Sequence, residues 1–100
     1  MPNEAILKAV EEKLEQVIDP ETGMSVMRMR LVEDLAVDEN GVVSSIFRPS
    51  SPLCPIAVPL ALSIMQTINA VPGVTGQRLR VEGYSQADQL NEILQSLMEP

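Results

Sequence analysis

The spacing of the apolar residues changes along the chain, and these changes restrict the possible folds more than any other feature of the sequence. Over residues 3–18 the spacing is helical, and the apolar positions are Ile6, Val10, Leu14 and Val17. Such a stripe predicts an amphipathic helix, with Asn3 available as its N-cap. The helix should end before the sequence DPETG, because Pro20 disfavours helical geometry at Asp19.

From Met27 the apolar residues follow a period of two, which predicts a half-buried strand. The residues on its expected inner face are Met27, Met29, Leu31, Leu35 and Val37. Glu33 interrupts this row, so a local bend or a rim position is expected near it. Asn40 and Gly41 predict a two-residue hairpin turn of type I′, because that turn needs positive φ at both central residues. A second strand should follow through Phe47, and a turn of this length places Glu33 opposite Arg48.

The second half of the chain contains two further apolar helical segments with a short strand between them. Residues 55–71 are apolar around most of the helix circumference, which predicts a helix that is largely buried or shared with a second subunit. Its start is open between Pro55 and Pro59. A third strand is expected at GQRLRVEG, with Leu79 and Val81 facing inward. The last segment predicts a helix with Ser85 as N-cap. Its apolar stripe consists of Leu90, Ile93, Leu94 and Leu97.

The resulting order α-β-β-α-β-α predicts an α+β fold, built as a two-layer sandwich. A small three-stranded sheet, made of the β-hairpin and one further strand, should be covered by helices on one face. No linker or internal repeat divides the chain, so residues 1–100 are expected to form a single domain.

Charge and composition narrow the partners and the compartment. Seven basic and fourteen acidic residues give a net charge of −7, which repels phosphate backbones and anionic lipids. We therefore expect no nucleic-acid and no membrane partner. The single cysteine cannot form an internal disulfide, and the N-terminus lacks the basic and apolar regions of a signal peptide. These features favour a soluble, cytoplasmic protein.

The absence of histidine removes the usual general base and the usual partner of a nucleophilic cysteine, so we expect no enzymatic activity. By elimination Cys54, between prolines in SSPLCPIAVP, is the best candidate for chemistry. It should lie at or just before a helix N-terminus, where a thiolate is stabilised and could accept hydrogen bonds from the hydroxyls of Ser50 and Ser51. One thiolate is only a quarter of a typical cluster or zinc site, so a reactive and an inert Cys54 both remain open.

Several motifs in order resemble one known family. They are IDPETGMSV, LVEDLAVDENGVV, SSPLCP, VPGV and RLRVEG. Together they are similar to the SufT and PaaD-like family of iron-sulfur (metal-sulfur) cluster assembly proteins, over roughly residues 4–83. The chain resembles a divergent member, because Arg30 stands where the family usually has glycine.

The resemblance implies a functional pocket. It would contain Asp19, Glu21, Ser50, Ser51 and Cys54, with Cys54 and Asp19 as the candidate metal ligands. It further implies an accessory protein that transiently holds iron or an iron-sulfur cluster and delivers it, with iron-sulfur scaffold or recipient proteins as partners and a possible homodimer. The alternative is a non-catalytic protein-protein interaction module of the same fold, in which Cys54 is purely structural.

Overall fold

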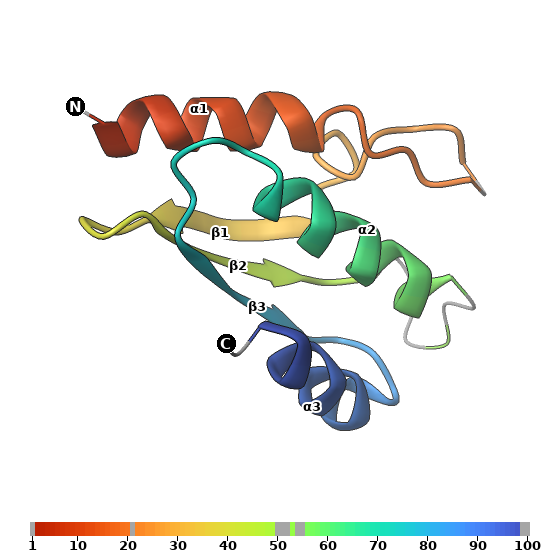
Figure 1. Ribbon diagram of the computed structural model, residues 1–100. Helices are drawn as coiled ribbons and strands as arrows, with labels where there is room; N and C mark the ends of the chain where they lie inside the picture. The colour runs from red at the N-terminus through yellow and green to blue at the C-terminus, as the bar shows by residue number, and fades with distance from the viewer. Residues whose placement is uncertain (1, 21, 50–52, 54–55, 99–100) are drawn as a thin grey trace.

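The computed structural model confirms the predicted fold class (Figure 1). It describes residues 2–20, 22–49, 53 and 56–98. The elements follow in the predicted order, and their bounds are α1 Pro2–Leu14, β1 Val32–Val37, β2 Val42–Phe47, α2 Ala57–Asn69, β3 Gly76–Val81 and α3 Ala87–Met98. Of the predicted site residues only Asp19 is described, because Glu21, Ser50, Ser51 and Cys54 lie outside these ranges.

The sheet has the strand order β1-β2-β3. β1 and β2 form the antiparallel hairpin, and β3 returns parallel to β2 after α2, with Val42 opposite Gly76 and Phe47 opposite Val81. The parallel pairing places the C-terminal ends of β2 and β3 at one end of the sheet. β1 begins at that same end, because Val32 lies opposite Phe47.

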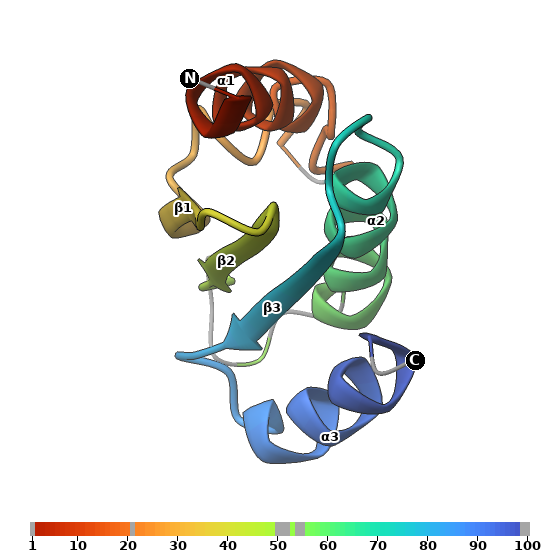
Figure 2. The ribbon, with the colours of Figure 1, turned by 60° about the vertical axis from the view of Figure 1, so that its left-hand side comes forward.

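α1 and α2 lie over one face of the sheet, and α3 lies along the β3 edge, so no helix of the described residues covers the opposite face (Figure 2). α1 packs against β1 and α2, while α3 contacts the outer strand β3. The core between the layers is aliphatic apart from Phe47, which is fully buried. In the part of the chain that the structure describes, no helix is long and apolar enough to span a bilayer.

The first helix is shorter than predicted and has a different start. It includes Pro2, so Asn3 is inside the helix and is not its N-cap. At the C-terminal end Gln16 and Val17 donate backbone hydrogen bonds to the carbonyls three residues earlier, which tightens the last turn and ends the helix at Leu14. Val17 nevertheless remains buried.

The strand predicted from Met27 begins five residues later, because residues 26–30 form a helical turn. The Ser25 hydroxyl accepts a hydrogen bond from the backbone N–H of Arg28 at 3.0 Å, which acts as a cap for this turn. The turn closes with bonds from Arg30 N–H to the Met27 carbonyl (3.1 Å) and from Leu31 N–H to the Val26 carbonyl (2.9 Å). This pair is the pattern of a Schellman motif, with Arg30 at the left-handed position.

The expected bend beside Glu33 is confirmed, since the register of β1 and β2 shifts between Glu33 and Ala36. The hairpin turn is longer than the predicted two-residue type I′ turn. Asp38 N–H donates to the Val42 carbonyl at 3.0 Å, which leaves residues 39–41 as the loop, and Gly41 is its residue with positive φ (86°). Glu33 lies opposite Ile46 in this register, yet its carboxylate still reaches Arg48 Nε at 3.4 Å.

The last two helices also begin at residues other than the predicted ones. α2 starts at Ala57 with Ile56 as N-cap. Pro59 is therefore the third helical residue. The N–H groups of the first helical residues have no partner inside the helix, so a proline at this position removes no helical hydrogen bond and does not have to mark the start. α3 starts at Ala87, and Gln86 in place of Ser85 provides the first helical carbonyl, to Leu90 N–H. Its stripe is split, because Leu90 and Leu94 are buried while Ile93 and Leu97 are exposed.

Candidate functional site

Asp19 is the one predicted site residue that the structure places, and it is buried, with 2% of its surface exposed. Its neighbours point outward: Ile18 is 49% exposed and Pro20 is also exposed. An extended segment alternates its side chains between two sides, and here the charged residue takes the inner side. A buried carboxylate beside an exposed isoleucine is the reverse of the usual arrangement and marks this segment as unusual.

Backbone hydrogen bonds fix the position of Asp19 in a small hairpin after α1. Ile18 and Ser25 form an antiparallel bridge. The Asp19 N–H donates to the Met24 carbonyl at 2.9 Å, and the Asp19 carbonyl accepts from Gly23 N–H at 2.8 Å. The main chain on both sides of the loop is therefore paired, so the loop holds Asp19 in one place.

The two segments that contain the predicted site leave the sheet at the same end. The loop with Asp19 leads into the start of β1, and the segment with Cys54 follows the end of β2. Arg48 N–H donates to the Leu31 carbonyl at 2.7 Å, which joins the two segments where they meet the sheet. In Figure 1 the loop after α1 and the first turn of α2 both lie on the right-hand side of the molecule.

The N-terminus of α2 has neither a side-chain cap nor an acidic residue in its first turn. Ile56 has no polar side-chain atom, so it offers no side-chain acceptor to the backbone N–H groups of the first turn. The partial positive charge of this helix end therefore lacks a compensating carboxylate within α2. Cys54 precedes the first residue of α2 by three positions in the sequence.

No complete metal site is present in the described ranges. Among their residues, no group of three or more His, Cys, Asp or Glu side chains could hold a metal ion. Asp19 is thus the single predicted ligand that the structure positions. Whether Glu21, Ser50, Ser51 and Cys54 join it lies outside the described residues.

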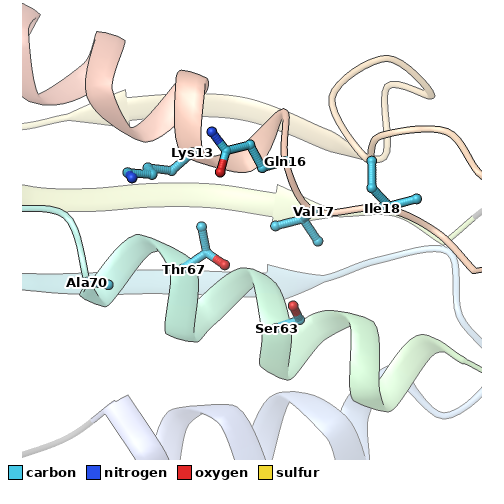
Figure 3. Close-up of a pocket in the computed structure, with 7 residues that line it drawn as sticks. All are labelled: Lys13, Gln16, Val17, Ile18, Ser63, Thr67 and Ala70. Carbon is cyan, nitrogen blue, oxygen red and sulfur yellow. The ribbon is translucent and has the colours of Figure 1, made fainter.

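A groove between the end of α1 and α2 was not foreseen from the sequence (Figure 3). Its volume is about 460 Å³, and its lining consists of Lys13, Gln16, Val17, Ile18, Ser63, Thr67 and Ala70. The sequence contained a signal for it, because Ser63 and Thr67 are four positions apart and place two hydroxyls on one side of a largely apolar helix. Ile18, in the lining, directly precedes Asp19.

The chain matches a known protein family over most of its length. Residues 7–78 match the family model of iron-sulfur cluster assembly proteins. The match covers well over half of the chain and contains both Asp19 and Cys54. The chain belongs to this family, which confirms the resemblance inferred from its motifs.

Individual relatives are similar over most of the chain. The uncharacterized protein MJ1129 of Methanocaldococcus jannaschii is 31% identical over 81 residues, which cover 81% of this chain and 85% of that protein. The Fe-S protein maturation auxiliary factor YitW of Bacillus subtilis is 28% identical over 78 residues, covering 78% of this chain and 76% of YitW. The crystal structure of a domain of unknown function, DUF59, from Bacillus anthracis has a TM-score of 0.72 at 25% identity and covers 95% of both chains.

Proposed function

We propose that this chain serves in the maturation of iron-sulfur proteins as a carrier or adaptor. It would hold iron or a cluster transiently through Cys54 and deliver it to client proteins. The observation that carries this proposal is the family match over residues 7–78, a stretch that includes Asp19 and Cys54. The similarity to YitW, named as an Fe-S protein maturation auxiliary factor, supports it. We assign the chain to the SufT and PaaD-like branch of the family on its motifs.

Cys54 is the proposed ligand because a thiolate is the form of cysteine that binds iron. The uncapped start of α2 supports this role, since the partial positive charge of a helix N-terminus stabilises a nearby thiolate. A single thiolate leaves the other positions on the metal to donors from outside the chain. A second subunit, a partner protein or a small thiol can supply them, and incomplete ligation by this chain favours release of the cargo.

Asp19 has the second role in this proposal. Its carboxylate is almost completely buried and the backbone on both sides of it is paired. Direct ligation of a cluster needs an accessible oxygen. We therefore favour a hydrogen bond that orients the site over coordination by Asp19, because such supporting groups fix the ligands that touch a metal.

Anaerobic reconstitution with iron and sulfide tests the ligand role. The wild type should gain visible absorbance and bound iron, and Cys54→Ala should lose both. Cys54→Ser is the matched control for side-chain size, and it should fail in the same way because a hydroxyl is a poor substitute for a thiolate. Asp19→Asn should still acquire iron but release it faster. Equal iron content in the wild type and Cys54→Ala would contradict the proposal.

A non-catalytic interaction module is the second candidate function, and the exposed apolar side of α3 favours it. Ile93 and Leu97 are 51% and 56% exposed. They are four positions apart and therefore lie on the same side of the helix. In this case the double variant Ile93→Ser and Leu97→Ser should lose binding to an iron-sulfur scaffold protein, whereas Cys54→Ala should keep it. The opposite pattern would favour the carrier.

The proposal does not involve catalysis by this chain, because it has no histidine to move protons at neutral pH. It places the protein in the cytoplasm, where iron-sulfur scaffold and recipient proteins are the expected partners. A homodimer is part of the proposal as a source of the second thiolate.

A further inference from the structure

The groove between α1 and α2 is lined by polar side chains that form no hydrogen bond or ion pair with the other described residues. Its polar side chains are Lys13, Gln16, Ser63 and Thr67. Within the described part of the chain, none of the four forms a hydrogen bond or an ion pair with another residue. Ser63 and Thr67 are half-buried, and their hydroxyls are available as hydrogen-bond partners for a ligand.

The figure shows how these groups are arranged (Figure 3). The Ser63 hydroxyl points from α2 toward the end of α1, and the Thr67 hydroxyl is directed along α2 toward Ser63 while its methyl points toward α1. The Gln16 amide lies on the opposite side, above Thr67. Lys13 lies at one end of this row, and Val17 and Ile18 lie at the other. The groove therefore has a cationic end, a row of hydrogen-bonding groups and an apolar end.

The charge of the lining indicates which ligands fit. Lys13 is its one ionised residue, although the chain as a whole has a net charge of −7. At the end of α1 the backbone carbonyls of Glu11, Lys13 and Leu14 accept hydrogen bonds from the residues that follow, so they are already paired within the chain. The lining thus offers donors and one positive charge, and it suits a negatively charged group.

We infer that this groove is a binding site for a small carboxylic acid that has a hydroxyl or amino group next to the carboxylate. The carboxylate pairs with the Lys13 ammonium, and the second polar group hydrogen-bonds to the hydroxyls of Ser63 and Thr67. Short aliphatic parts of the ligand lie against Val17 and Ile18. The groove volume of about 460 Å³ is in the usual range for small-molecule sites. The site does not include Cys54, so its test does not depend on iron binding.

Amide chemical shifts measured by NMR test the site, with malate, citrate and inorganic phosphate as the probes. Malate or citrate should produce saturable shifts at Gln16, Ile18, Ser63, Thr67 and Ala70. Lys13→Gln should weaken this binding about tenfold, the change expected when one charge-assisted hydrogen bond is lost. Lys8→Gln is the matched control, because it removes the same charge from an exposed position of α1 outside the groove. It should leave the affinity within about twofold of the wild type.

Three results would overturn the inference. The first is the lack of saturable shifts with both acids. The second is an equal loss of affinity in Lys8→Gln and Lys13→Gln, which would mean that only the overall charge matters. The third is binding of phosphate as tight as that of malate, because a bare anion does not need the hydroxyls of α2. A double variant, Ser63→Ala and Thr67→Ala, should abolish the preference for malate over succinate, which lacks the hydroxyl.

Discussion

Arg30 lies in a backbone conformation that most residues avoid. Its φ is 60°, and it occupies the left-handed position that closes the turn of residues 26–30, where glycine is the usual residue. The family resemblance led to the same position, since Arg30 stands where the family usually has glycine. The sequence could identify this departure, but its cost appears only once the backbone conformation is known.

Arg30→Gly should therefore stabilise the protein by about 1 kcal/mol, because glycine lacks the Cβ that makes left-handed geometry unfavourable. The free energy of unfolding from urea titration measures this change. Arg28→Gly is the matched control: Arg28 is exposed and lies in the same turn without positive φ. That variant should lose up to about 1 kcal/mol. A loss of stability in Arg30→Gly would contradict the proposed strain.

Asp19 illustrates a second limit of residue-level prediction. The motif identified it as a site residue, but the sequence did not indicate that its carboxylate is buried. Burial depends on which side of the small hairpin faces the core, and this is set by the pairing of Ile18 with Ser25. Neither residue is part of a recognisable strand pattern.

At the scale of elements, apolar periodicity predicted each helix and strand, while their ends depended on contacts that the sequence does not reveal. The hairpin loop is an example. The Thr75 N–H donates to the Gly41 carbonyl at 3.0 Å, and the Thr75 hydroxyl donates to the Asn40 carbonyl at 2.7 Å. The loop is therefore fixed against the residues before β3. This tertiary contact accompanies a longer turn than Asn-Gly alone predicts.

Gly41→Ala should destabilise the protein by about 2 kcal/mol or more, since it combines the cost of positive φ with a steric clash. A Cβ at Gly41 would lie 2.7 Å from the Gly73 carbonyl oxygen. Gly23→Ala is the control, because Gly23 also has positive φ and its Cβ would meet nothing within 4 Å. It should cost about 1 kcal/mol. If urea titration gave equal losses in the free energy of unfolding for the two variants, the close contact between the loop and Gly73 would be contradicted.

The contact between α3 and β3 includes a paired amide that the sequence did not predict. The Asn91 side chain accepts a hydrogen bond from Val81 N–H at 2.7 Å and donates to the Val81 carbonyl at 3.0 Å. It thus occupies the backbone groups with which a neighbouring strand would pair. Covering an outer strand in this way limits its pairing with other chains.

Asn91→Ala should lower the free energy of unfolding by about 1–3 kcal/mol, because it leaves two partly buried backbone groups of Val81 without their partner. It should also raise the tendency to aggregate at the outer edge of β3. Gln89→Ala is the matched control, as Gln89 is exposed on the same helix. Its effect should stay within about 0.5 kcal/mol. An equal effect of both variants on unfolding, measured in urea, would contradict the capping role of Asn91.

At the scale of the whole molecule, the order of elements and the helix-covered sheet were predictable because each element has its own apolar period. The family was predictable from motifs in sequence order, and the match over residues 7–78 confirmed it. The groove was not predicted, because its lining comes from two helices whose relative position depends on packing. The candidate site was predictable only in part. Its residues were named from the motifs, and Asp19 is the one among them whose position the structure describes.

The central claim is that the chain delivers iron-sulfur cargo through Cys54. Cluster transfer tests it most directly: wild-type protein and Cys54→Ala are each incubated anaerobically with iron and sulfide, passed through a desalting column, and mixed with apo-ferredoxin. We predict that the wild type converts apo-ferredoxin to the holo form faster than the same amount of free iron and sulfide, and that Cys54→Ala gives no acceleration. Equal transfer by the wild type and Cys54→Ala would contradict the claim.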